Sequence, residues 1–160
     1  MNIGVRFGFS NHKTIYMQRL SLLLIPVVML LVASCSKNND TPPPPITNFS
    51  ATLNGASEET PTGSAATGSA VGNYNSDTKE LKLTITYSGL VPTAGHIHKG
   101  AVGVSGPVVF PFASVATSPI VFDAVLDAAQ EADLMAGLYY VNFHTPAFPA
   151  GEIRGQLVKM

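Results

Sequence analysis

The sequence predicts an all-β domain, either an antiparallel β-sandwich or a Greek-key barrel, with about eight strands and one short helix. Apolar and polar residues alternate with a period of two over residues 80–88, where Leu81, Leu83 and Ile85 are separated by lysine and threonine. The 14 Gly and 12 Pro residues divide the chain into short segments. A succession of short strands separated by turn residues is typical of sandwiches and barrels.

Each expected strand is a short apolar segment bounded by turn residues. Residues 75–79, Asn-Ser-Asp-Thr-Lys, accept turn conformations, so they predict a hairpin between strands 68–74 and 80–88. The other strands are expected, in chain order, at residues 49–54, 94–98, 107–112, 120–126, 138–144 and 152–158. The helix is expected at 127–136, because Asp127 can cap it, Gln130 stands at capping-box spacing and Gly137 can close it.

Residues 1–34 are expected to be a signal peptide. They contain the basic residues Arg6, Lys13 and Arg19, no acidic residue, and an apolar run at 20–33. This run of about fourteen residues is shorter than the roughly 20 that span a bilayer. Met17 stands just before the run, and we expect it to be the initiator.

The end of the apolar run, Leu-Val-Ala-Ser-Cys at residues 31–35, resembles the lipobox of bacterial lipoproteins. The resemblance implies that Cys35 receives a diacylglycerol and becomes the new N-terminus, and its acyl chains would supply a stable membrane anchor. The alternative is a free cysteine after an ordinary signal peptide. Residues 35–46 are polar and then proline-rich, which predicts a tether. We therefore expect a lipid-anchored protein of the bacterial cell envelope, periplasmic or surface-facing.

The charge of the exported part excludes one class of partner. After residue 34 the chain keeps 10 acidic residues and 9 - 3 = 6 basic ones, a net charge of 6 - 10 = -4. The basic residues are scattered, so no nucleic-acid partner is expected. The sequence also lacks a Gly-x-Ser-x-Gly elbow and a phosphate loop, and we expect no catalysis.

Several blocks of the sequence resemble the CHRD domain, which is named for chordin, an extracellular antagonist of bone morphogenetic proteins. The blocks are ATLNG at 51–55, GHIHKG at 95–100, YVNFHT at 140–145 and PAGEIRGQL at 149–157. The resemblance covers residues 47–158 of an expected domain at 47–160. It implies a binding or adhesion module that faces an extracellular or periplasmic ligand of unknown identity.

The histidines are the main candidates for chemistry. His96 and His98 are two residues apart, as are Asn142 and His144, so each pair lies on one face of its strand. If the residues between and beside them, Ile97, Val141 and Phe143, face the core, we expect the histidines and Asn142 on the outer surface. In adjacent strands the three imidazoles could hold copper or zinc in an open three-histidine site.

Two interpretations of His96, His98 and His144 stay open. In the first, they only hydrogen-bond the glycine-rich loops and the domain is a non-catalytic binding module. In the second, they bind a metal ion, with redox activity as a further option. The His-x-His strand also resembles the copper-ligand strand of Cu/Zn superoxide dismutase, but the zinc-subsite ligands and disulfide cysteines of that enzyme have no counterpart here.

The last strand contributes two further candidate ligand contacts beside Asn142. Glu152 and Arg154 are two apart and share a face. We expect an exposed ion pair or an arginine bound to loop carbonyls, and the alternative is that Arg154 lies near the histidines and guides an anionic ligand. Tyr139 and Tyr140 are expected to pack one in the core and one over an edge.

Overall fold

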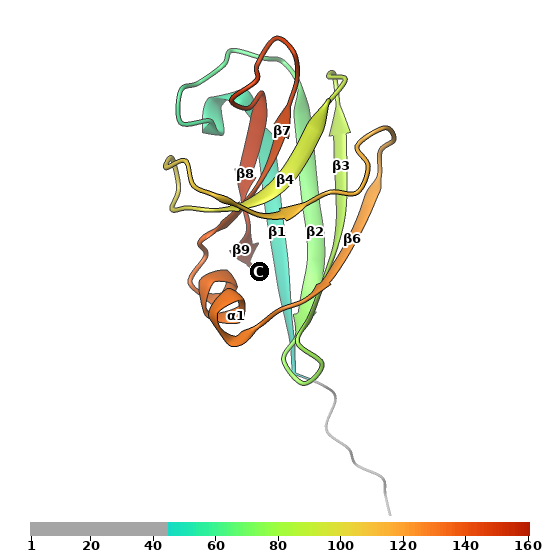
Figure 1. Cartoon of the computed structure of the whole chain (residues 1–160), viewed down its shortest axis with the longest axis vertical. Coiled ribbons are helices and arrows are strands. Elements are labelled where there is room, and N and C mark those ends of the chain that lie inside the picture. The colour runs from blue at the N-terminus through green and yellow to red at the C-terminus, as the bar shows by residue number, and fades with distance from the viewer. Residues whose placement is uncertain (1–44) are drawn as a thin grey trace, which may run out of the picture. The chain divides into compact units, whose positions relative to one another are not determined.

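Nine antiparallel strands form one continuous curled sheet in residues 45–160, the part of the chain that this computed structural model describes (Figure 1). The prediction of an all-β antiparallel fold with one short helix is confirmed. The expected signal peptide, Cys35 and the tether up to residue 44 lie outside the described residues. No helix of residues 45–160 has the length and apolar character that crossing a membrane requires.

The strands match the expected segments closely. They are, in chain order, β1 (Ile46–Asn54), β2 (Thr67–Asn75), β3 (Glu80–Ser88), β4 (Ala94–Lys99), β5 (Val108–Pro111), β6 (Ile120–Val125), β7 (Tyr139–His144), β8 (Ile153–Gln156) and β9 (Val158–Lys159). The single strand expected at 152–158 is divided in two. The N–H of Leu157 donates to the Tyr139 carbonyl (2.9 Å), whereas Val158 pairs with Ser50 of β1.

The sheet order places segments that are distant in sequence side by side. The strands follow one another as β5-β4-β7-β8-β1-β2-β3-β6, and β9 pairs with β1. The curled sheet brings its two edge strands together through aromatic rings: Phe122 of β6 lies 5.6 Å from Phe110 and 5.8 Å from Phe112, between ring centroids. In the strand order given above, β4, β7 and β8, which carry the candidate site residues, are direct neighbours.

The core lies on one face of this sheet, where the period-two pattern of β3 places its apolar residues. Leu83 is 2% exposed and Ile85 is fully buried, whereas Thr84 and Thr86 are exposed. Burying such a side chain stabilises the fold by about 1.5 to 3 kcal/mol. The opposite face of β4, β7 and β8 carries polar side chains, and the candidate site residues of these strands lie there.

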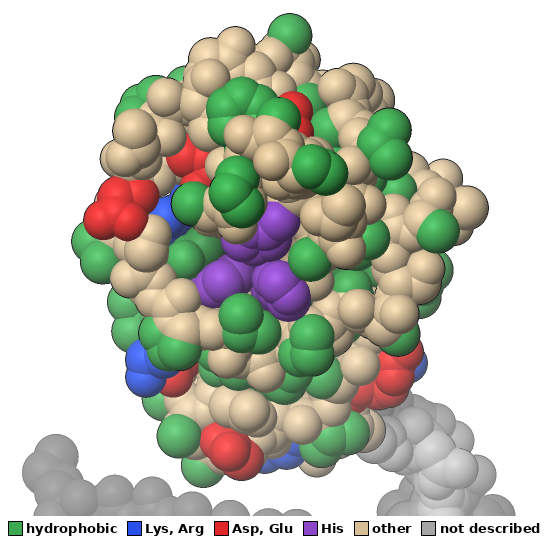
Figure 2. Space-filling model, turned by 45° about the horizontal axis from the view of Figure 1, so that its top comes forward, with side chains coloured by type: hydrophobic (Ala, Val, Ile, Leu, Met, Phe, Trp, Pro, Cys, Tyr) green, Lys and Arg blue, Asp and Glu red, His purple; other side chains and the backbone are tan. Residues whose placement is uncertain are grey.

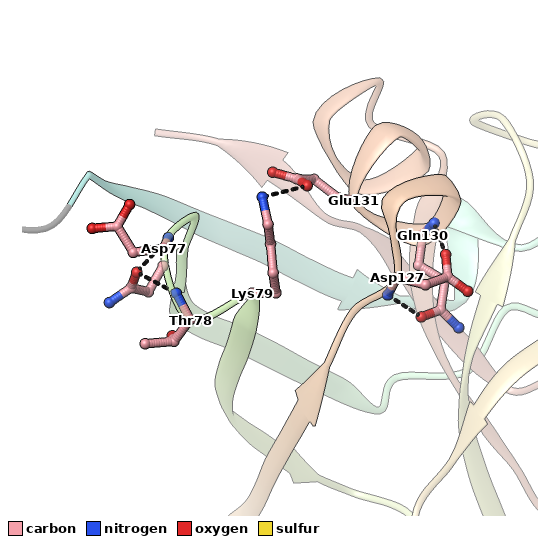
Figure 3. Close-up of polar contacts among 7 residues, drawn as sticks. Asp77, Thr78, Lys79, Asp127, Gln130 and Glu131 are labelled. Carbon is pink, nitrogen blue, oxygen red and sulfur yellow. Dashed lines mark hydrogen bonds and ion pairs between the residues drawn. The ribbon is translucent and has the colours of Figure 1, made fainter.

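Helix α1 (Ala128–Met135) begins where the sequence predicts. The Asp127 carboxylate accepts from the Gln130 N–H (2.8 Å) and the Gln130 side chain accepts from the Asp127 N–H (2.9 Å), which completes the capping box. Lys79, in the β2–β3 turn, pairs with Glu131 of the helix at 3.0 Å (Figure 3). Leu134 is fully buried and anchors the helix in the core. A short 3-10 turn, Gly55–Ser57, was not expected from the sequence.

Candidate functional site

The pairing of β4 with β7 brings the three histidines together. His96 lies opposite Asn142 and His98 opposite Tyr140, and His144 is two residues further along β7. One possible ligand nitrogen from each ring lies within 4.8 Å of the other two. The ring centroids are 5.0 to 5.8 Å apart. Figure 2 shows the three rings side by side on one face of the molecule, bordered by hydrophobic side chains.

The two faces of these strands are assigned correctly by the sequence, but the polar face is more covered than expected. Ile97, Val141 and Phe143 are fully buried in the core. The expectation that all the histidines and Asn142 lie on the outer surface is wrong, since Asn142 is 3% exposed and His98 is 8% exposed. Loops cover them: Gly106 contacts His98, and a Cβ at Gly151 would lie 2.6 Å from the Asn142 amide. His96 and His144 are half-buried.

Hydrogen bonds define which nitrogen carries the proton in two of the rings. His98 Nδ1 lies 2.9 Å from the Gly106 carbonyl oxygen, and His144 Nδ1 lies 3.1 Å from that of Pro149. A carbonyl only accepts, so each Nδ1 donates, and in the neutral form of such a ring Nε2 keeps its lone pair. These two Nε2 atoms and Nδ1 of His96 are buried without a hydrogen-bond partner. Each ring therefore offers one unpartnered nitrogen.

Burial favours the neutral form of two of the imidazoles. Burial lowers the pKa of His96, and the neighbouring His144 and His98 lower it further. Burial also lowers the pKa of His98; the hydrogen bond to Gly106 opposes this, while His144 and Arg154 add to it. A neutral imidazole is the form that binds a metal ion, so these two rings are ready to act as ligands at neutral pH.

Arg154 is buried on the polar face, opposite Asn142, and takes the second of the two expected arrangements, an arginine bound to loop carbonyls. It is 2% exposed, and its Nη2 donates to the carbonyls of Ala101 (3.3 Å) and Val104 (3.2 Å), so it is not in an exposed ion pair. Its guanidinium carbon also lies 3.6 Å from the centre of the Tyr140 ring.

Glu152 connects two loops and does not contact Arg154 within ion-pair distance in residues 45–160. Its carboxylate accepts from Ser64 (2.7 Å) and from Thr145 (2.5 Å), and the residue is 8% exposed. Both carboxylate oxygens accept hydrogen bonds inside the protein, so Glu152 holds these two segments together.

Asn142 contacts a residue that the sequence reasoning missed. Its Nδ2 donates to Glu58 at 3.3 Å, and burial raises the pKa of Glu58 to about 7, against the opposing effects of Arg154 and of this hydrogen bond. Glu58 follows the 3-10 turn in a loop without periodicity, so no sequence signal indicates where it lies.

Tyr140 was not among the predicted site residues, although the alternation of side chains along β7 indicates which face it lies on. The expectation that one of Tyr139 and Tyr140 covers an edge is wrong, since both are buried. Tyr139 faces the core, and Tyr140 lies on the histidine face, with its ring stacked on His98. The period of two that places Asn142 and His144 on one face includes residue 140 as well.

The fold and the site define a class: a curled all-β domain with a polar face on which the adjacent strands β4 and β7 place three histidines. The model of the CHRD domain family matches residues 49–157, so the chain belongs to the CHRD domain family, as the sequence blocks predict. No curated protein and no solved structure matches the chain significantly.

Proposed function

We propose that this CHRD domain is a binding module that holds one copper(II) or zinc ion through His96, His98 and His144. The observation that carries the proposal is the convergence of three imidazoles, each with a possible ligand nitrogen within 4.8 Å of the other two. Each ring also has one nitrogen that is buried without a hydrogen-bond partner. Buried polar atoms usually find a partner, and an unsatisfied one costs roughly 1 to 3 kcal/mol. A metal ion would partner all three nitrogens.

The distances are compatible with a metal after a small movement of the rings. Metal–nitrogen bonds of about 2.0 to 2.1 Å in a tetrahedral site place the ligand nitrogens roughly 3.3 to 3.4 Å apart. The present limit of 4.8 Å therefore requires some closure of the rings. With three imidazoles and no other ligand, such an ion would keep an open position, as in sites where a water or a partner completes the coordination.

The competing role, in which the histidines only fix loops, explains two of the three residues. His98 and His144 use Nδ1 for loop carbonyls, which leaves Nε2 for another purpose. The Nδ1 atom of His96 has no hydrogen-bond partner among residues 45–160. Loop fixing therefore does not account for His96, whereas metal binding uses all three rings.

Titration calorimetry of the untagged protein with Zn²⁺ and Cu²⁺ tests the proposal. We expect about one equivalent of metal to bind, and affinity to fall as the pH drops through the imidazole range near 6.5, because protons compete for the nitrogens. His96→Ala should weaken binding sharply, and it removes no loop hydrogen bond from Nδ1. Thr84→Ala, at an exposed position of β3 outside the histidine group, is the control. Absence of saturable binding, or binding that survives replacement of all three histidines, would overturn the proposal.

We further propose that the module is exported and attached to the membrane through acylated Cys35. The support is the sequence of residues 31–35, the single cysteine and the polar, proline-rich segment that follows it. An anchored metal-binding module would act in the bacterial cell envelope, where no nucleic-acid partner is expected.

A further inference from the structure

We propose that Arg154 and Tyr140 are positioning residues: through the loop 100–106 they hold His98 in the tautomer that leaves Nε2 free to bind the metal. The inference rests on the proposed metal site. It goes beyond that proposal because it assigns a role to two buried residues that do not supply a ligand atom.

Arg154 is held in an unusual way for a buried cation. None of the ion pairs in residues 45–160 includes it, and its Nη2 instead donates to two carbonyls of the loop, those of Ala101 and Val104. A buried charge is costly unless it is hydrogen-bonded. The loop carbonyls at Nη2 and the Tyr140 ring, 3.6 Å from the guanidinium carbon, supply part of this compensation, while Nη1 is buried without a hydrogen-bond partner among residues 45–160. The loop conformation and the buried guanidinium therefore stabilise each other.

Tyr140 holds the end of the same loop. Its hydroxyl oxygen accepts from the Gly106 N–H at 3.1 Å, and the Gly106 carbonyl accepts from His98 Nδ1 at 2.9 Å. The loop approaches closely at this point, because a Cβ on Gly106 would overlap the Lys99 carbonyl. A chain of contacts thus runs from Tyr140 through the backbone of one residue, Gly106, to the proton on His98.

The ring of Tyr140 also fixes the plane of His98. The two rings are stacked, with centroids 5.0 Å apart and planes 7° apart. His98 belongs to β4 and Arg154 to β8, which flank β7 on opposite sides, so Tyr140 has one of its two partners on each neighbouring strand. The position, plane and tautomer of His98 therefore depend on one connected group of side chains.

The consequence for binding follows from the tautomer. If the Gly106 carbonyl moves away, His98 Nδ1 loses its acceptor, and the ring can place its proton on Nε2 instead. A protonated Nε2 cannot bind a metal ion. Loss of residues that orient a ligand histidine typically weakens metal binding 10- to 100-fold, and we expect about this effect when either residue is changed.

Two conservative variants test the inference in the full chain. Tyr140→Phe keeps the ring but removes the oxygen that accepts from Gly106. Arg154→Lys keeps the charge but lacks the planar group that contacts both carbonyls and the ring. Ile153→Val is the matched control, since Ile153 is buried on the core face of the same strand. The measurements are the ¹⁵N chemical shifts of His98 in the metal-free protein, which report the tautomer, and Zn²⁺ titration.

We expect wild type and Ile153→Val to show a proton on Nδ1 of His98 and equal Zn²⁺ affinity. Both test variants should show mixed tautomers and affinity lowered about 10- to 100-fold. The inference is overturned if wild-type His98 carries its proton on Nε2, if the variants keep the wild-type tautomer, or if tautomers mix without loss of affinity in a protein that binds Zn²⁺. If wild type binds no metal but the variants change the tautomer, the proposed function fails while the control of His98 by Arg154 and Tyr140 stands.

Discussion

His98 and Tyr140 lie directly opposite each other on β4 and β7, and their rings are stacked with planes only 7° apart. Tyr140 contacts the histidine group on one side and Arg154 on the other. Arg154 in turn donates hydrogen bonds to the loop 100–106, whose Gly106 contacts His98. The candidate site is therefore a product of strand pairing, which brings residues some forty positions apart into contact.

The period-two pattern of β3 yields a test of the fold. Leu83→Ala or Ile85→Ala should lower the free energy of unfolding by about 2 to 5 kcal/mol, because each leaves a cavity in the core. Thr84→Ala and Thr86→Ala, on the exposed face, should change it by at most about 0.5 kcal/mol. Denaturant unfolding of the four variants measures the difference. Equal effects on the two faces would contradict the burial of Leu83 and Ile85.

The sequence was sufficient for the strands and for the direction of their side chains, because both depend on local periodicity and turn residues. It placed β3 at residues 80–88 and the faces of His96 and Asn142 correctly. The sequence did not predict which segments cover those faces, because the residues of a loop follow no regular hydrophobic pattern. The burial of Arg154 and the approach of Glu58 to Asn142 both depend on loops whose paths are set by tertiary contacts.

A second prediction concerns the contact of Gly151 with the buried polar residues. Gly151 has a φ of +138°, and an added Cβ would lie 2.6 Å from Asn142 Nδ2 and 2.8 Å from Glu58 Oε1. Gly151→Ala should therefore destabilise the protein by more than the backbone strain alone, which is about 1 to 3 kcal/mol. Gly103→Ala is the control, because Gly103 also has a positive φ, +76°, but has open space around its Cβ position. Thermal unfolding that shows equal losses for both would contradict this packing.

The proposed lipid anchor gives a third prediction. Cys35→Ala should yield an uncleaved or soluble protein that incorporates no labelled fatty acid, because the thiol is the acceptor of the diacylglycerol. Radiolabelled palmitate incorporation and membrane fractionation in a bacterial host measure both effects. Ser36→Ala, the next residue, is the control and should be labelled like wild type. Equal labelling of the Cys35 variant and wild type would remove the anchor from the proposal.

The fourth prediction concerns the pH dependence of stability. Burial raises the pKa of Glu58 from 4.5 to about 7, so the folded protein binds a proton that the unfolded chain has already lost in this range. Glu58 therefore makes the folded protein less stable as the pH rises from 4.5 through about 7, and the loss is complete once the pH exceeds this pKa. At about 1.4 kcal/mol per pKa unit, the upper limit is roughly 3.5 kcal/mol, and we expect about 1 to 3 kcal/mol.

Comparison of wild type with Glu58→Gln isolates this effect. The lowered pKa values of His96 and His98 act in the opposite sense, since the unfolded chain then binds more protons and stability rises with pH through the imidazole range. Both proteins retain these histidines, so their contribution cancels in the difference. Between about pH 5 and about pH 8, the stability of Glu58→Gln relative to wild type should rise by about 1 to 3 kcal/mol in urea unfolding with a chelator present. Glu59→Gln, the neighbouring exposed carboxylate, controls for loss of a charge in the same loop. A difference between wild type and Glu58→Gln that does not change with pH would show that the Glu58 carboxyl is solvated in the folded protein.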